Sequence, residues 1–243
     1  MKLGKLPARQ DPRTLRLAKY QTTLPTIPKA AHWGHGLPFE MLGNDRYGDC
    51  VEAAYGHMLQ IWIDRAGGSF IPDSTNVLGA YTALTGFNPN VPGTDRGTDM
   101  LAAANYWRNT GMNGYEIDAF LALNPQRQDE IRSSVAFYGG ANIGLQLPLT
   151  AQDQSSPTGV WSVTSGTGSV AGSWGGHCVP VCGYDAQSLW VVTWGYIQKM
   201  TWEFYSTYCD EAFVFLAHEW IEHTGMSPSG LAWGQLQADL ANL

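Results

Sequence analysis

Charged residues are scarce in this sequence, since Asp, Glu, Lys and Arg together make up 14% of its 243 residues. Glycine is abundant, with 28 residues. This combination is typical of a loop-rich α+β protein rather than a helical bundle. Ten tryptophans and eleven tyrosines are enough to build a sizeable core. The chain is therefore long and apolar enough for one large domain or for two lobes that share a cleft.

The sequence also lacks long apolar runs. No stretch is long enough to span a membrane, and no apolar segment follows the basic residues near Met1, as a secretory signal would require. No internal repeat is visible either. We therefore expect a protein that makes no membrane contact and that is cytoplasmic or virion-associated rather than secreted.

Cysteine pairs with metal-binding spacing are missing as well. The four cysteines are Cys50, Cys178, Cys182 and Cys209. Without a secretory signal we expect them to be reduced. A zinc site would have to combine Cys178 and Cys182 with a histidine pair, either His32 and His35 or His218 and His223, and no Cys-x-x-Cys spacing supports this. We predict no metal and no cofactor.

Charge is distributed unevenly along the chain. The net charge is −7, which argues against a nucleic-acid-binding body. Residues 1–20 nevertheless carry one acidic residue, Asp11, against a set of basic ones: Lys2, Lys5, Arg9, Arg13, Arg16 and Lys19. This basic arm either tethers the protein to an acidic partner or nucleic acid, or lies on the acidic body of its own subunit or a neighbour. The second interpretation is the simpler one.

The stretch from Asn44 to Ala54 places a cysteine at the predicted start of a helix. Residues 51–64 contain no proline and carry apolar side chains at helical spacing, which predicts a buried helix. Asp49 is a candidate N-cap. Cys50 would lie in the first turn, where free N–H groups and the helix dipole favour a thiolate. Cys50 is therefore a candidate nucleophile, although a lone cysteine is more often a small buried apolar residue.

A second group of motifs lies late in the chain. His177 begins an apolar run that ends in the turn Gly183-Tyr184-Asp185, and residues 189–195 follow as the partner strand of a hairpin. In a strand, Cys178 and Cys182 share one face and His177 points to the other. The chain thus carries a cysteine early, a histidine late and then a polar residue beside Trp194, and this order along the chain is informative about function.

The remaining patterns predict a mainly helical first half and a second half richer in strands. Helices are predicted over residues 75–84, 99–110, 124–134 and 207–223, a turn and strand over 135–147, a long loop over 152–172 and a strand-like alternation over 199–205. After a break at residues 227–230, residues 231–243 can form a short amphipathic helix. That helix either packs on the main body or contacts a partner or a second copy.

These motifs resemble those of papain-like cysteine peptidases. In that family a Gln lies six residues before the nucleophile, and Asn44 holds that place here while Gly48 to Cys50 match the end of the motif. Leu24-Pro25 and Trp33 resemble the start of the family domain, residues 95–98 its Gly-Gly loop, and residues 131–147 the segment leading into its second half. The similarity spans residues 24–216 and suggests a divergent member of phage or bacterial type.

The resemblance implies a papain-like α+β fold with a defined division of the chain. A helical lobe carrying the nucleophile helix, about residues 24–123, would pack against an antiparallel β-barrel-like lobe, about residues 124–223. The basic arm, residues 1–23, would precede this domain. Residues 224–243 would form a C-terminal appendage.

The resemblance also assigns roles at a site. Cys50 would be the nucleophile and His177 its acid–base partner. The Cys50 backbone N–H and the Asn44 side chain, one methylene shorter than the family's Gln, would bind the oxyanion. The family's third residue is an Asn; without a gap its place is Val192, and a one-residue slide brings Thr193 there to orient His177. Substrate-binding residues would be Gly97, Thr98 and Trp194, with the loop 152–172 at the rim.

Three functional hypotheses follow. The first is a cysteine peptidase that cleaves a peptide or isopeptide bond in a peptide or protein substrate. The second is a non-catalytic protein on the same fold, such as a phage virion component, which assembles through its N-terminal arm and C-terminal segment and has a blocked cleft. The third is a cell-wall amidase of the related Cys-His class, whose negative charge would be repelled by anionic wall polymers.

Overall fold

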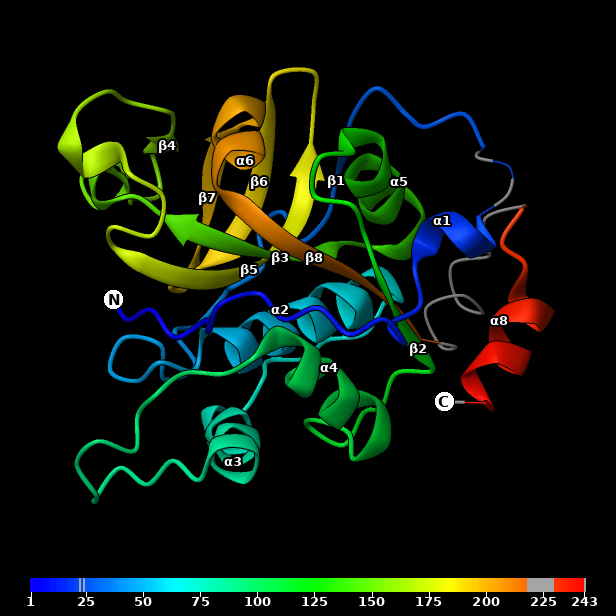
Figure 1. The fold of residues 1–243 in the computed structure, drawn as a ribbon, viewed down its shortest axis with the longest axis horizontal. Coiled ribbons are helices and arrows are strands. Elements are labelled where there is room, and N and C mark those ends of the chain that lie inside the picture. Colours follow the sequence, from blue (N-terminus) through cyan, green and yellow to red (C-terminus); the bar gives the residue numbers. More distant parts are fainter. Residues whose placement is uncertain (22, 24, 218–229, 243) are drawn as a thin grey trace.

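The computed structural model describes residues 1–21, 23, 25–217 and 230–242, and its elements follow a helical-then-β order (Figure 1). The helices are α1 (Leu17–Tyr20), α2 (Cys50–Arg65), α3 (Ser74–Thr85), α4 (Met100–Asn109), α5 (Gln128–Tyr138), α6 (Trp202–Tyr208) and α8 (Trp233–Leu240), with short 3-10 turns η1 (Leu149–Ala151) and η2 (Thr167–Ser169). The strands are β1 (Ala31–His32), β2 (Ala119–Ala122), β3 (Ala141–Leu147), β4 (Val160–Trp161), β5 (Gly175–Tyr184), β6 (Ser188–Thr193), β7 (Tyr196–Thr201) and β8 (Cys209–Leu216).

The strands form one mixed sheet in the order β2-β8-β3-β5-β6-β7-β4, with β1 paired to β5. All neighbours are antiparallel except β4 and β7, which are parallel. The predicted α+β class is confirmed, because the helix that begins at Cys50 packs against a mostly antiparallel sheet. The predicted hairpin is also present, because β5 and β6 pair directly.

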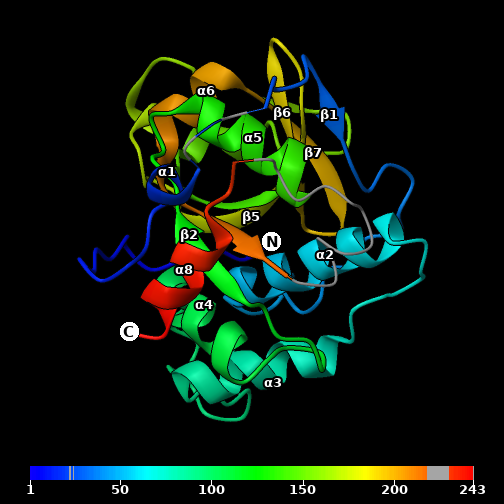
Figure 2. The ribbon, with the colours of Figure 1, turned by 90° about the vertical axis from the view of Figure 1, so that its right-hand side faces the viewer.

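Helix α2 lies between the sheet and the helices α3 and α4 (Figures 1 and 2). It contacts β5 on one side and α3 and α4 on the other. One apolar cluster joins α2 to α4 and β8 through side chains such as Tyr55, Trp107 and Phe215. A second cluster lies between the sheet and α5 and α6. The first cluster thus holds the helix that carries Cys50 from two sides, through buried apolar contacts with the sheet and with α4.

The predicted helix over residues 207–223 is wrong for its first part, which forms β8. This strand pairs with β2 on one edge and β3 on the other, and nearly all of its residues are buried. A strand buried on both faces reads as a continuous apolar run, and short apolar runs do not distinguish strand from helix by periodicity. Residues 218–223 lie outside the described residues.

Two further boundaries differ from the prediction. The strand-like stretch at 199–205 ends at Thr201, whose Oγ1 accepts a hydrogen bond of 3.1 Å from Phe204 N and so caps α6. The helix predicted over 124–134 is α5, which begins and ends four residues later and stops at Gly139 with φ of 80°. The loop 152–172 also contains the short strand β4 and the turn η2.

The C-terminal helix is shorter than predicted and packs on the body. Helix α8 contacts α1, and its Leu236 is completely buried. The break predicted at residues 227–230 lies almost wholly outside the described residues. In the part of the chain that the structure describes, no helix combines the length and apolarity needed to cross a membrane.

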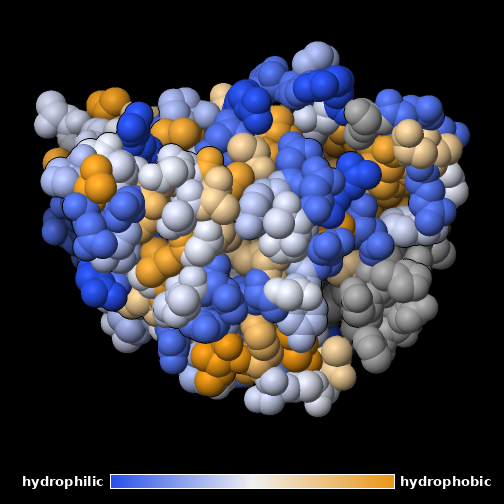
Figure 3. Space-filling model, turned by 90° about the horizontal axis from the view of Figure 1, so that it is seen from below, coloured by the Kyte–Doolittle hydropathy of each residue, from blue (hydrophilic) through white to orange (hydrophobic). Residues whose placement is uncertain are grey.

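The basic arm lies on acidic residues of its own chain. Its ion pairs join Lys5 to Asp210 and Glu211, Arg9 to Asp99, and Lys19 to Asp239. Seen from below, apolar side chains on the surface lie in separate groups among polar ones (Figure 3). This face therefore carries no single broad apolar surface.

Candidate active site

Cys50 is the first residue of α2 and is buried, with 2% of its surface exposed. The first backbone bond of the helix runs from Ala53 N to Asp49 O, so the Cys50 N–H precedes the helical hydrogen bonds. A cavity of about 10 Å³, enough for one water at most, is shared by Cys50, Asn44, His177, Thr193 and Trp194. The structure therefore brings the predicted catalytic residues to one place, between α2 and the β5–β6 hairpin.

His177 is fixed by two contacts from the end of β6. Its Nε2 lies 2.7 Å from the Thr193 hydroxyl oxygen. The Trp194 ring stacks on the imidazole with centroids 4.5 Å apart and an angle of 12° between the planes. Val192, the gap-free alternative to Thr193, also lines the cavity, but its apolar side chain packs with Ile61 and Cys182 and offers no hydrogen bond to the imidazole. The other ring nitrogen, Nδ1, has no hydrogen-bond partner among the described residues.

Asn44 shares this cavity, but its amide is engaged within its own loop. Nδ2 donates to the Tyr47 carbonyl oxygen at 3.0 Å and to Asp49 Oδ1 at 3.2 Å. Because both partners are acceptors, the nitrogen must face them, and both of its protons are used. The sequence predicted Asp49 as the N-cap, and Asp49 does hold that position, but its side chain makes no capping hydrogen bond. The Asn44 amide would have to leave these partners to reach an oxyanion.

The N-terminal residues cover this site. We call residues 2–6 the covering segment; it runs between α2 and the sheet (Figure 1). At one end Lys2 N donates to Asn44 O at 2.9 Å, and Trp194 Nε1 donates to Lys2 O at 3.2 Å. These bonds place the start of the segment directly beside the predicted catalytic residues.

The other end of the covering segment is paired on both edges. Thr98 N donates to Gly4 O at 2.7 Å, and Leu6 N donates to Thr98 O at 3.0 Å. Lys5 N donates to Gly176 O at 3.0 Å. A Cβ on Gly97 would overlap the Gly4 carbonyl oxygen, so glycine is required there for the close approach. The three predicted substrate-binding residues, Gly97, Thr98 and Trp194, therefore all contact the covering segment.

Comparison with known proteins identifies the fold. No family model matches the sequence, and no curated protein matches it. Among solved structures, xylellain, a cysteine protease from Xylella fastidiosa, aligns with a TM-score of 0.70 and 16% identity over 88% of this chain and 96% of its own. The chain has a papain-like fold. Digestive procathepsin L 3 of Tenebrio molitor larval midgut (TM-score 0.59, 14% identity, 84% of this chain and 74% of that one) agrees.

A cysteine protease of Carica candamarcensis, solved in complex with E-64, shares the papain-like fold too. It aligns with a TM-score of 0.55 and 14% identity over 79% of this chain and 99% of its own. The fold that the motif resemblance implied is thereby confirmed. Identities this low establish the fold and leave the chemistry of the site to its own geometry.

Electrostatics within this papain-like fold keep the pair uncharged while it is covered. Burial raises the pKa of Cys50 to about 12, opposed in part by hydrogen bonds from the backbone of Cys178 and Gly4. Burial lowers the pKa of His177 to about 3. The sequence predicted a thiolate from the helix N-terminus, but in the covered site desolvation outweighs the dipole. Thiol and neutral imidazole are therefore the forms present near neutral pH.

Two carboxyl groups next to Cys50 are buried as well. Burial raises the pKa of Asp49 to about 7 and that of Glu52 to about 8, and the neighbouring Thr98 hydroxyl opposes part of the rise for Glu52. Both side chains are therefore protonated in mildly acidic solution. At that pH the two neutral carboxyl groups place no negative charge near the Cys50 sulfur.

Glu52→Gln should flatten part of the pH dependence of stability. Between the unfolded pKa near 4.5 and about 8 the folded protein holds a proton on Glu52 that the unfolded chain releases, so the free energy of unfolding falls as pH rises. Glutamine has no such proton. Urea unfolding from pH 5 to 8 should show the wild type losing stability relative to the variant, by up to about 1.4 kcal/mol per pH unit. A constant difference across this range would contradict the assigned protonation.

Several residues at the site were missed by the motif search. His57 lies two turns along α2 from Cys50 and lines the same cavity, with Nε2 2.8 Å from Glu40 O. Its i, i+7 spacing from Cys50 places both residues on one face of the helix and could have predicted His57 at the site. Lys5 of the covering segment meets Asp210 and Glu211 of β8, and no local pattern links residues so far apart in the chain.

Proposed function

We propose that this protein is a cysteine hydrolase that cleaves a peptide or isopeptide bond with Cys50 and His177, and that residues 2–6 hold it in a covered resting form. The observation that carries the proposal is the state of His177. One ring nitrogen is held by Thr193, the other has no hydrogen-bond partner in the part of the chain that the structure describes, and the ring shares a cavity with Cys50. Activation of a thiol requires a base that is oriented through one ring nitrogen and can accept the proton at the other.

In the proposed reaction, the Cys50 thiol passes its proton to the free nitrogen of His177. The thiolate then attacks the carbonyl carbon, and the oxyanion is bound by the Cys50 backbone N–H. Collapse of this intermediate breaks the C–N bond, and His177 gives its proton to the leaving amine. Water, deprotonated by His177, then hydrolyses the thioester and frees Cys50. Thr193 keeps the imidazole in position throughout.

The covering segment is held in a way that resists attack. The Gly4 backbone lowers the pKa of the Cys50 thiol, as a donating N–H does, whereas a carbonyl oxygen that accepts from the thiol would raise that pKa. The Gly4 carbonyl oxygen is turned to Thr98 N. The sulfur therefore faces an amide nitrogen rather than a carbonyl carbon, and the peptide oxygen is not at the Cys50 N–H. Residues 2–6 can thus occupy the site without being cut.

Peptide hydrolysis by a Lys5→Ala chain tests this function. Removing the ammonium leaves the partly buried carboxylates of Asp210 and Glu211 without their cation and removes both ion pairs that hold the covering segment, which should release it. We expect cleavage of a fluorogenic peptide mixture by this variant, little by the wild type, and none by Lys5→Ala with Cys50→Ala. Lys19→Ala, which removes an exposed ion pair of the same arm, is the matched control and should behave as the wild type. A folded, uncovered variant that cleaves no peptide would refute the proposal.

A non-catalytic assembly protein on the same fold is the second candidate. The covered cleft and the engaged Asn44 amide both favour it. It predicts that Lys5→Ala exposes Cys50 without any hydrolysis. It also predicts a stable oligomer, which sedimentation of the wild type would detect. A monomer that gains hydrolysis on uncovering would exclude this candidate.

A further inference from the structure

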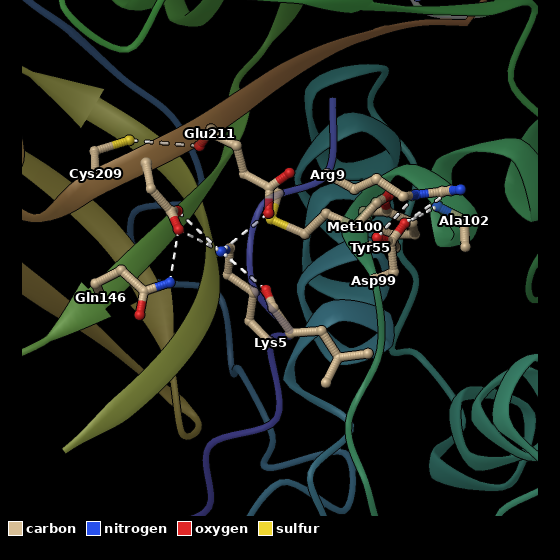
Figure 4. Close-up of polar contacts among 11 residues, drawn as sticks. Lys5, Arg9, Tyr55, Asp99, Met100, Ala102, Gln146, Cys209 and Glu211 are labelled. Atoms are coloured by element: carbon tan, nitrogen blue, oxygen red, sulfur yellow. Dashed lines mark hydrogen bonds and ion pairs between the residues drawn. The ribbon is translucent and has the colours of Figure 1, made fainter. Parts of the chain in front are cut away.

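The Lys5 side chain fills a closed pocket in the sheet. Its side chain has no exposed surface, and its Nζ lies 2.9 Å from Asp210 Oδ1, 2.9 Å from Asp210 Oδ2 and 3.0 Å from Glu211 Oε1. A further hydrogen bond of 3.1 Å goes to the Leu6 carbonyl oxygen. Figure 4 shows the side chain reaching toward Glu211 and Gln146. The three ammonium protons thus all find acceptors.

A β-bulge builds the acidic end of this pocket. Between β3 and β8 the register shifts, so that Gly144 pairs with Glu211 and Leu145 pairs with Cys209. Asp210 is the extra residue. In a regular strand adjacent side chains point to opposite faces, but a bulge turns neighbours toward the same side. Asp210 and Glu211 can therefore both reach one ammonium group.

Gly144 opens the channel to this acidic end. A Cβ there would overlap Lys5 Cε and lie 2.8 Å from Glu211 Cγ. The missing side chain therefore leaves the space that the lysine methylenes fill. Gln146, two residues along the same strand, donates from Nε2 to Asp210 Oδ2 at 2.6 Å and fixes that carboxylate. The channel is matched in length and in charge to an extended lysine.

The pocket requires a cation. Burial raises the pKa of Glu211 to about 6, and Lys5 opposes this rise. Without an occupant, two neighbouring carboxylates would be left partly buried with their charges uncompensated. An apolar side chain would bury them further, whereas an ammonium group offsets one of the two negative charges and contacts both carboxylates. The chemistry thus favours a basic occupant whenever the covering segment leaves.

We propose that the pocket of Gly144, Gln146, Asp210 and Glu211 selects a lysine side chain of the substrate. The inference rests on the proposed function and names its substrate class. Lys5 shows the fit from within the chain and competes with the substrate for the same place. Opening of the site and recognition of the substrate are therefore two uses of one pocket.

The direction of the covering segment fixes where that lysine lies in a substrate. The segment passes Cys50 with Gly4, whose carbonyl oxygen accepts from Thr98 N at 2.7 Å, so that its N–H side is turned to the sulfur, and it then enters the pocket with Lys5. An extended chain running the opposite way exchanges the positions of N–H and C=O. It would enter the pocket first and then present a carbonyl to Cys50. The preferred lysine is thus the residue just before the one whose carbonyl is attacked.

Two short substrates test the pocket on the full-length Lys5→Ala chain. They are acetyl-Lys-Gly-aminomethylcoumarin and its norleucine analogue, which keeps the methylenes and lacks the charge. We expect kcat/KM to be about tenfold to a hundredfold higher for lysine. The uncleavable acetyl-Lys-Gly amide should also slow alkylation of Cys50 by iodoacetamide more than the norleucine amide does. This second measurement reports binding without turnover.

Variants of the pocket identify the groups responsible. On the Lys5→Ala background, Glu211→Gln and Asp210→Asn should each reduce the preference for lysine, and Gly144→Ala should weaken binding of both ligands. Asp239→Asn, which removes a carboxylate that pairs with Lys19 far from the pocket, is the control and should leave the preference unchanged. Gly4→Val supplies a second uncovered chain, which keeps Lys5 and all four residues of the pocket.

The outcomes separate the two proposals. Protection of Cys50 by the lysine ligand without hydrolysis would support the pocket and refute the peptidase. Hydrolysis of both substrates at equal rates in both uncovered chains would support the peptidase and overturn the pocket. A preference for arginine over lysine in an otherwise identical substrate would also overturn the lysine assignment.

Discussion

Replacing Gly4 by valine should raise the rate of Cys50 alkylation by iodoacetamide at pH 7 at least a hundredfold. A Cβ on Gly4 would overlap the Gly48 carbonyl oxygen, so the covering segment cannot keep its place. Cys50 would then lose the burial that raises its pKa to about 12. At pH 7 a thiol with that pKa is ionised to about one part in 10⁵, against a few per cent for a thiol of ordinary pKa near 8.5.

Intact-mass analysis over time measures this rate for each chain. Gly79→Val is the matched control, because Gly79 is exposed on α3 and a Cβ there meets no neighbouring atom. That variant should react as slowly as the wild type. Mapping the label to Cys50 excludes the other cysteines, all of which are buried. Equal rates for Gly4→Val and the wild type would show that the covering segment does not limit access to Cys50.

Adding His177→Ala to the Gly4→Val chain should lower alkylation at pH 6 about a hundredfold. Once uncovered, the thiol pKa falls and the imidazole pKa rises, because both shifts come from burial. The proton can then pass from Cys50 to His177, and the ion pair holds the thiolate below its usual pKa. Without His177 the reaction should follow an ordinary thiol, rising as pH approaches about 8.5.

The pH profile of alkylation from pH 4 to 10 decides this prediction. Gly4→Val should show a plateau that begins below pH 7, and the double variant should show a single rise at higher pH. Thr193→Val on the same background should give an intermediate profile, because the imidazole loses its acceptor but remains stacked on Trp194. If Gly4→Val and the double variant with His177→Ala share one profile, Cys50 and His177 do not interact, and the result favours the non-catalytic candidate.

These two results together would also explain how a covered site remains functional. Burial makes the pair neutral and unreactive, while the same residues are positioned for ionisation once solvent enters. The covering segment then acts on the protonation of the site as well as on access to it. Both effects follow from the removal of water and need no rearrangement of α2 or the sheet.

Local patterns in the sequence predicted much of the fold. The buried helix over residues 51–64 became α2, and the runs beginning at His177 and Leu189 became the hairpin β5–β6. These elements are long or strongly patterned, and their signals come from near neighbours in the chain. The motif order of cysteine, histidine and Trp194 carried the resemblance to the papain-like fold, which the solved structures confirm.

The same local patterns failed where distant residues decide the conformation. Residues 209–216 become strand because β2 and β3 supply partners on both edges, and no feature within that stretch excludes a helix. The Asn44 side chain matched a motif position, but its contacts with Tyr47 and Asp49 are set by the shape of the loop. Motif position gives the residue type and leaves its hydrogen bonds undetermined.

The sequence by itself determined the helix that carries Cys50, the strand that carries His177 and the presence of a basic arm. Only the tertiary structure decided that the arm covers Cys50 and that Lys5 enters an acidic pocket. Lys5 and Asp210 are 205 positions apart in the chain. Their meeting depends on a sheet that assembles nearly all of its strands after residue 119, on a bulge in β8 and on the missing side chain of Gly144. No local periodicity encodes such a contact, because it arises from packing between distant segments.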